Sequence, residues 1–418
     1  MRRLALVAGT LVIVVGVMLL VRPRDGSVAP PPPPVVGHRL FDEVFARVRA
    51  SLVDPLDDEE LYRRAALGVI GELDDPYAYL ELPGEPALPA ADAPLPQGLF
   101  LDRREGRAVV VAALPGSPAA AAGLRPGDVL VSVDTALINA NRLQTAARLL
   151  AGSPGSRVTV RVRRDGNLLA RDLVRGPLPS LAPLEFTDLG GGVARVRLNR
   201  IGPGTADSLQ RTILAREGQG IRSLVLDLRS TAQGGSDLSA GVRLADLFLD
   251  RGTVLAVSRM RHASGNQSLT DSTPSPFAAM PLAVLIDGGT AGAAELLAGT
   301  LQDHDRAIVL GQESYGRGAT WSRFSLGDGA VLTLTTALWL TPNGRQIQRP
   351  LTPDSAAAGD AERPRVRSDA GRMLTGGGGI VPDRVIREGS DDVVLAEARR
   401  ILMRATRPEA VFALAGPR

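Results

Sequence analysis

The first pattern along the chain is an uncharged, mostly apolar stretch over residues 4–21, which lies between Arg3 and Arg22. At about 1.5 Å per residue, a helix of this length spans roughly 27 Å, close to the hydrocarbon thickness of a bilayer. The pattern therefore predicts that residues 1–21 are an uncleaved membrane anchor, with a cleaved signal peptide as the alternative. The very short N-terminal tail favours an N-terminus in the cytoplasm, so we expect the folded domains on the periplasmic side of the inner membrane.

Two helices are predicted after a proline-rich linker, residues 22–37, in which the prolines at 30–34 favour an extended conformation. Apolar residues recur at spacings of three and four over residues 40–52, which is typical of a helix with one buried face. An aspartate followed three residues later by a glutamate is a suitable N-cap for a second helix over residues 57–73. We therefore expect a packed helical hairpin within an N-terminal helical segment, residues 38–90.

The pattern changes in residues 91–178, where short apolar runs alternate with turn residues. Such runs predict strands, and one segment with helical spacing, residues 142–150, is closed by a glycine two positions later. These features together predict a small β-rich module. Its expected strands are residues 98–101, 108–113, 129–133 and 158–162.

Apolar runs and helical patterns alternate in residues 179–404, and residues 405–418 form a tail. This alternation is typical of an α/β layer structure, so the sequence predicts a mixed α/β (α+β) multidomain protein. The expected strands are residues 193–198, 223–228 and 282–286, and the expected helices are residues 205–217, 238–249, 291–301 and 391–403.

Composition excludes several kinds of chemistry. All 48 basic side chains among the 418 residues are arginine, so there is no lysine, and there is also no cysteine. Cysteine nucleophiles, disulfides, thiolate metal sites and lysine bases are therefore excluded. A net charge of +3 and 3% aromatic residues do not favour nucleic acid binding. No acidic and histidine residues have metal-ligand spacing, and no phosphate-binding loop is present, so we expect no metal and no cofactor.

Two runs in the β-rich module resemble those of PDZ domains. They are residues 96–100 (PQGLF) and residues 123–128 (GLRPGD). The resemblance implies that the backbone N–H groups of Gly98, Leu99 and Phe100 face the terminal carboxylate of a bound peptide, which adds to the sheet edge as an extra strand. The expected partners are therefore the C-terminal tails of proteins.

The α/β segment and its flanks resemble the carboxyl-terminal processing proteases, also called tail-specific proteases. The similarity covers about residues 40–386 and rests on many ordered matches. The resemblance implies a Clp/crotonase-like α/β core and hydrolysis of peptide bonds near the C-termini of substrate proteins. The matching runs include residues 73–76 (LDDP), 226–229 (LDLR), 288–295 (GGTAGAAE), 301–304 (LQDH), 315–318 (YGRG), 340–345 (LTPNGR) and 379–383 (GIVPD).

The resemblance also implies a catalytic serine at a helix N-terminus, a neutral lysine that activates it, and a glutamine that orients the lysine. In this sequence the three positions carry Gly292, Arg317 and Trp321. Glycine has no nucleophilic atom, and a guanidinium with a pKa above about 12 is no base near neutral pH. In a serine protease, loss of the catalytic residues lowers turnover about a million-fold.

The backbone amides of Gly234, Gly235 and Ala293 match the family's oxyanion positions and remain in the sequence. Binding groups are thus retained while the reacting groups are replaced. The sequence therefore predicts a catalytically inactive homologue that binds C-terminal tails or an active protease partner. Whether the chain self-associates stays open.

Two alternatives accompany this prediction. In the first, the chain is an active serine- or threonine-type endopeptidase with a displaced nucleophile, for which Thr290 is the candidate, although a structural role for this threonine is favoured. In the second, the bulky Trp321 fills the cleft and the degenerate core is structural.

Other polar residues are interpreted as structural. Asp303 and His304 are adjacent on a predicted helix, so their side chains do not face one another, and we expect a scaffold role. Ser236 and Ser314 are loop serines for which the sequence suggests no nearby base. His262, which follows Arg259 and Arg261, is expected on a solvated surface.

Overall fold

The computed structural model divides the chain into two compact units, residues 1–68 and 69–418. The predicted anchor, residues 1–21, and nearly all of the predicted linker lie outside the described residues. Within the part of the chain that the structure describes, no helix is long and apolar enough to cross a membrane. The described residues are 37–73, 75, 77–84, 94–104, 106–139, 143–232, 238–271, 274–349, 363–386 and 391–415.

The described part of the first unit consists of helix α2 (Gly37–Ser51) and most of helix α3 (Asp58–Gly71), which continues into the second unit. The predicted N-cap of α3 is confirmed, because the Asp57 carboxylate accepts a hydrogen bond from the backbone N–H of Glu60 at 2.7 Å. This contact satisfies one of the amides that have no partner within the first helical turn.

The apolar stripe of α2 is less covered than the sequence predicts. The Phe45 ring lies 5.9 Å from that of Phe41 and 4.5 Å from that of Tyr62 on α3, measured between centroids. No residue of α2 is buried, and Phe41 and Val44 are 46% and 53% exposed. The expected buried face is therefore wrong for this helix, because one neighbouring helix covers only part of the stripe.

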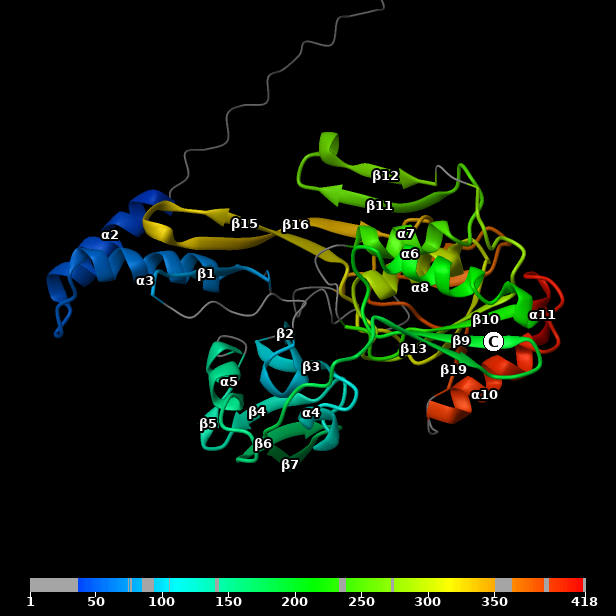
Figure 1. The fold of residues 1–418 in the computed structure, drawn as a ribbon. Helices are drawn as coiled ribbons and strands as arrows, with labels where there is room; N and C mark the ends of the chain where they lie inside the picture. The colour runs from blue at the N-terminus through cyan, green and yellow to red at the C-terminus, as the bar shows by residue number, and fades with distance from the viewer. Residues whose placement is uncertain are drawn as a thin grey trace, which may run out of the picture. The chain divides into compact units, whose positions relative to one another are not determined.

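An antiparallel sheet in the order β2-β3-β4-β6-β7 forms the β-rich module, with β5 (Ala136–Leu137) paired to β4 (Figure 1). The four predicted strands and the predicted helix are confirmed. The sequence missed β7, whose residues are mostly exposed and so carry a weak apolar pattern. The bounds are Leu99–Arg104 for β2, Arg107–Ala113 for β3, Val129–Val133 for β4, Arg157–Arg164 for β6, Asn167–Val174 for β7, Pro118–Ala121 for α4 and Leu143–Leu150 for α5.

The second sheet has the order β19-β14-β13-β10-β9-β8; its strands are parallel except β8, which is antiparallel to β9. Helices α6, α7 and α8 cover one face and α10 and α11 the other (Figure 1). The predicted α/β layers are confirmed. The strands are Leu184–Asp188 (β8), Val193–Leu198 (β9), Ser223–Asp227 (β10), Leu282–Ile286 (β13), Ile308–Gly311 (β14) and Arg384–Val385 (β19), and the helices are Thr205–Leu214 (α6), Ser239–Asp246 (α7), Ala293–Asp303 (α8), Asp391–Leu402 (α10) and Ala410–Ala415 (α11).

A third sheet, in the order β1-β16-β11-β12 with β15 paired to β16, was not predicted. The ten-residue β16 alternates apolar and polar side chains only over residues 332–335, so its periodic signal in the sequence was short. The bounds are Tyr79–Glu81 for β1, Val254–Met260 for β11, Gln267–Thr270 for β12, Ala319–Ser325 for β15 and Val331–Leu340 for β16, and a separate pair is formed by β17 (Arg365–Arg367) and β18 (Met373–Thr375).

Candidate functional site

Gly292 lies immediately before α8, after the turn that leaves β13. Its backbone has φ 63° and ψ −121°, a combination that residues other than glycine rarely adopt. Glycine takes this conformation without a Cβ penalty. The helix is therefore preceded by a tight turn, and its N-cap residue has no side chain.

The buried carboxylate of Glu295 organises this turn. Its Oε2 accepts hydrogen bonds from the backbone N–H groups of Gly292 at 3.0 Å and Arg317 at 2.7 Å. Its Oε1 accepts from the Gly316 N–H at 2.6 Å and from the Ser314 hydroxyl at 2.5 Å. Burial raises the pKa of Glu295, and these four donors oppose that rise. One carboxylate thus holds the backbone of Gly292 and that of Arg317 next to each other.

No role was predicted for Glu295, although the sequence carried a signal for one. A glutamate three residues after a helix N-cap is the spacing at which the side chain reaches back to the N-cap amide. The expectation that Ser314 has no base nearby is wrong, because this carboxylate contacts its hydroxyl. The pair is buried, and the same hydroxyl also accepts a hydrogen bond from the Ile380 N–H at 2.7 Å.

We expect Glu295→Gln to lower the free energy of unfolding by about 2 kcal/mol, the usual cost of leaving one buried amide without an acceptor. If the new NH₂ replaces Oε1, the Ser314 hydroxyl can turn to accept from it, but the Gly316 N–H cannot. Urea unfolding measures the loss, and faster hydrogen exchange at the Gly316 amide locates it. The matched control is Glu409→Gln, an exposed glutamate, which should stay within about 0.5 kcal/mol of the parent. Equal stability of the two variants would contradict the role of Glu295.

Arg317 is buried, and its guanidinium pairs with Asp102 of β2. Nη2 and Nε lie 3.0 and 3.3 Å from Asp102 Oδ2. The guanidinium also lies 5.4 Å from the centre of the Tyr315 ring. Burial alone would lower the pKa of Arg317, but the charge of Asp102 and the neighbouring tyrosines raise it above its ordinary value. Arg317 therefore stays a cation and takes no proton from a nucleophile.

Asp102 connects Arg317 to Trp321 through one more side chain. The Tyr77 hydroxyl lies 3.4 Å from Asp102 Oδ2, and the Tyr77 ring stacks on Trp321 with 5.0 Å between centroids. Burial and the Asp102 charge raise the pKa of Tyr77, which keeps its phenol neutral. Arg317 and Trp321 are thus joined in one network, which we call the Arg317 network (Tyr77, Asp102, Tyr315, Arg317 and Trp321). Asp102 and Tyr77 were not found from the sequence.

The other candidates for the reaction are placed as follows. Thr290 is buried; its hydroxyl donates to the Leu228 carbonyl at 2.8 Å and accepts from the Asp287 N–H at 3.0 Å. This geometry favours the structural role. Ala293 is the buried first residue of α8. Gly234, Gly235 and Ser236 lie outside the described residues.

The proposed peptide-binding turn is well packed. Gly98 has φ 81°, and a Cβ on it would lie 2.4 Å from the Ser117 Cβ, so only glycine fits. Its N–H donates to the Leu95 carbonyl at 3.0 Å, so this amide is already used within the module, contrary to the expectation. The side chains of Leu99 and Phe100 are buried, so a peptide would meet only their backbone. β2 is nevertheless the edge strand of the described sheet, as strand addition requires.

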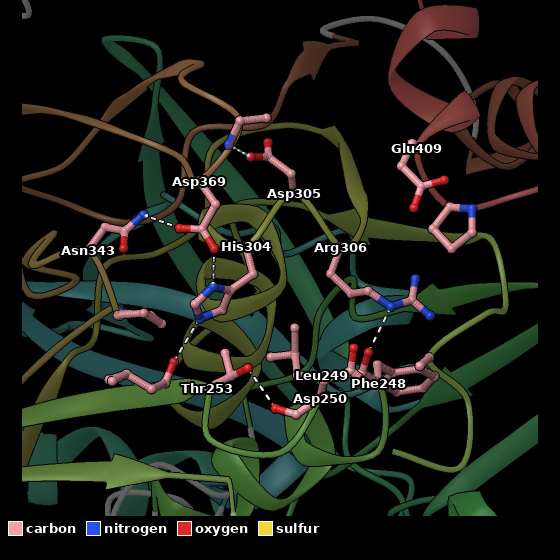
Figure 2. Close-up of a pocket in the computed structure, with 15 residues that line it drawn as sticks. Phe248, Leu249, Asp250, Thr253, His304, Asp305, Arg306, Asn343, Asp369 and Glu409 are labelled. Carbon is pink, nitrogen blue, oxygen red and sulfur yellow. Dashed lines mark hydrogen bonds and ion pairs between the residues drawn. The ribbon is translucent and has the colours of Figure 1, made fainter. Parts of the chain in front are cut away.

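Asp303 and His304 point in different directions, as expected for neighbours on a helix. Asp303 Oδ1 pairs with Arg345 at 2.5 Å, whereas His304 contacts Asp369 Oδ2 through Nδ1 and the Val254 carbonyl through Nε2, each at 2.7 Å. Figure 2 shows the His304 ring turned toward Asp369 in the wall of a cavity of about 700 Å³. No three potential ligands among the described histidine, aspartate and glutamate residues are grouped to hold a metal ion. His262 is exposed, as expected.

Comparison with known proteins agrees with this architecture. Residues 192–357 match peptidase family S41, and residues 109–164 match the PDZ domain. The chain is 28% identical over 402 residues to the carboxy-terminal-processing protease of Bartonella bacilliformis, covering 87% of each chain. It is 31% identical to the chloroplastic C-terminal processing peptidase of Tetradesmus obliquus, covering 71% of this chain and 68% of that protein.

Among solved structures, the photosystem II D1 C-terminal processing protease superposes with a TM-score of 0.66 at 26% identity, over 90% of this chain and 94% of that one. It shares the N-terminal helices, the antiparallel PDZ-like sheet and the mixed α/β core, so the predicted fold class is confirmed. The similarity extends over both the PDZ domain and the core that carries Gly292 and Arg317. The chain therefore belongs to peptidase family S41, the C-terminal processing peptidases, and contains their PDZ domain.

Proposed function

We propose that this C-terminal processing protease homologue does not hydrolyse peptides and instead works by binding C-terminal tails through its PDZ domain. The observation that carries the proposal is the Arg317 network. The residue at the family's lysine position is buried, charged and paired with Asp102. At the same time the nucleophile position is Gly292, which has no atom that could attack a carbonyl carbon.

The retained fold supports binding. A PDZ domain takes a peptide as an added strand, and the edge strand β2 with its glycine turn is intact. The bound ligand is then either the tail of a client protein or the tail of an active protease partner. The sequence of residues 4–21 further supports anchoring in the inner membrane, with the folded domains on its periplasmic side.

The proposal is tested with the full chain purified in detergent micelles. Fluorescent peptides that end in apolar residues are titrated to follow binding by anisotropy, and the same mixtures are examined for cleavage by mass spectrometry. We expect saturable binding, no cleavage, and loss of binding when the peptide carries a C-terminal amide in place of the carboxylate. Cleavage at a rate that scales with enzyme concentration would overturn the proposal.

Variants at two threonines distinguish cleavage by a displaced nucleophile of this chain from cleavage by a contaminating protease. Thr290→Val removes the candidate hydroxyl. Thr300→Val is the matched control, because Thr300 is also buried and donates to one carbonyl, that of Leu255, at 2.7 Å. Turnover that disappears only in Thr290→Val would establish the active alternative.

A further inference from the structure

A second pocket, of about 560 Å³, lies between the PDZ domain and the α/β core within the second unit. Three arginines are among the residues that line it. Arg195 and Arg197 come from β9, and Arg125 comes from the turn between α4 and β4. This pocket is distinct from the PDZ edge strand β2 and from the Arg317 network, and nothing described so far gives it a role.

The strand pattern explains why the arginines gather here. Residues 193, 195 and 197 of β9 point to the same side of the sheet. Val193 packs in the hydrophobic cluster with α10 and α11, whereas the next two residues on this side, toward the carboxyl end of the strand, are Arg195 and Arg197. The carboxyl ends of parallel strands are where open α/β sheets bind ligands. The sheet face therefore changes from apolar to cationic at the position expected for a ligand.

The charges of this region do not cancel. Asp227 on β10 is buried, and its two oxygens are held by Arg229 at 2.8 and 2.7 Å. Burial alone would raise the pKa of Asp227, but Arg229 and then Arg197 and Arg195 lower it, so the carboxylate is ionised. Glu185 is the other carboxylate, and it accepts a hydrogen bond from Asn199. Arg229 neutralises Asp227 behind the pocket, and the lining itself carries three guanidinium groups (Arg125, Arg195 and Arg197) against the Glu185 carboxylate, an excess of two positive charges.

Arg195 is the group with unused donors. Its Nε is buried and has no hydrogen-bond partner among the described residues. The nearest carboxylate oxygen, Asp227 Oδ2, is 3.8 Å away, too far for a hydrogen bond. The side chain is 21% exposed, so the rest of the guanidinium reaches the pocket. Nε itself faces Asp227 and is closed to the pocket, but the exposed amino groups of the same guanidinium can donate to an oxyanion, which also supplies the missing negative charge.

We propose that this pocket binds an oxyanion, a carboxylate or phosphate group, through Arg195 and Arg197. The Arg197 guanidinium contacts Asn199 Oδ1 at 3.2 Å and the Arg229 carbonyl at 3.4 Å, which holds it at the wall of the pocket. A guanidinium is the side chain best suited to planar oxyanions, because its donors form a rigid fork. The site is separate from tail binding at β2, so its failure would leave the proposed function untouched.

The test is isothermal titration calorimetry on the full chain in detergent micelles with two probes. The first is inorganic phosphate, and the second is an acidic peptide with an amidated C-terminus, which offers no terminal carboxylate to the PDZ domain. We expect saturable, salt-sensitive binding of at least one probe. Binding of phosphate alone would identify a free phosphate ligand, and binding of the peptide alone would identify acidic side chains. Absence of saturable binding of both probes up to about 10 mM, well beyond the range expected for paired guanidinium groups, would overturn the proposal.

Variants locate the site. Arg195→Gln should weaken binding about tenfold, since it removes a charge-assisted hydrogen bond, and the double change with Arg197→Gln should abolish it. The matched control is Arg200→Gln, an exposed arginine that follows Asn199 but does not itself line the pocket, and this variant should bind within twofold of the parent. If Arg195→Gln does not fold, Arg125→Gln in the exposed turn serves instead, with at least a threefold loss expected. Unchanged affinity in the folded variants would also overturn the proposal.

Discussion

A variant that carries Gly292→Ser, Arg317→Lys and Trp321→Gln will restore the three family residues and still hydrolyse peptides poorly, until Asp102 is changed as well. A lysine at position 317 would meet the carboxylate that now lies 3.0 Å from Arg317 Nη2. A carboxylate this close raises a lysine pKa by one to three units, so little neutral amine would exist to act as a base. Adding Asp102→Asn removes that charge, and we expect kcat/KM to rise about 10- to 1,000-fold over the triple variant.

The measurement is kcat/KM with a fluorogenic peptide across pH 6 to 10. The apparent pKa of the lysine should fall when Asp102→Asn is added, which distinguishes a change in basicity from a change in binding. The matched control is Asp165→Asn, a change in an exposed turn of the same domain that should leave the triple variant as it was. Equal activity and equal pH profiles with and without Asp102→Asn would show that this carboxylate does not set the charge at position 317. The new serine must also accept the φ of 63° now held by Gly292, at a cost of about 1–3 kcal/mol.

Asp102→Ala will be the most destabilising single substitution in the Arg317 network. It leaves the Arg317 guanidinium buried without a counter-charge, and breaking a buried pair in this way costs about 3–5 kcal/mol. The loss should be visible as a lower urea midpoint with an unchanged slope. Replacing both partners, as in Asp102→Leu with Arg317→Met, should recover most of the stability, because well-packed apolar side chains need no counter-charge.

The matched control is an exposed ion pair. Arg49 and Asp58 lie 3.0 Å apart with side chains 62% and 51% exposed, so Arg49→Ala should cost less than about 1 kcal/mol. A loss of similar size in Asp102→Ala would mean that the buried pair contributes no more than a surface one. A double variant that is no more stable than Asp102→Ala would mean that the loss comes from other contacts of Asp102, such as its hydrogen bond from Tyr77.

Local patterns predicted much of the fold. The buried strand β13 has the bounds that the sequence predicted, because a strand covered on both faces is apolar at every position and here lies between Pro281 and Asp287. Gly292 and Arg317 could be singled out because each lies in a short ordered motif, and in the structure their backbone N–H groups donate to one carboxylate.

The sequence did not predict side-chain contacts between residues that lie far apart along the chain. Asp102 pairs with a residue 215 positions away, and no spacing along the chain records such a contact. Tyr77 and Trp321, whose rings stack, are also far apart along the chain. The sequence therefore suggested only that the bulky Trp321 side chain fills a cleft. The error on α2 has the opposite origin, since a helical period shows which face is apolar but not whether a neighbour covers it.

The pairing of Arg317 with Asp102 also bears on how this chain can evolve. Arg317→Lys alone creates a cation that Asp102 keeps protonated, and Asp102→Asn alone leaves a buried arginine without its counter-charge. Each single step toward a working dyad therefore gives no activity, and the second also weakens the fold. If the chain is inactive, as we propose, selection for stability alone preserves that state, and proteolysis would require several changes to arise together.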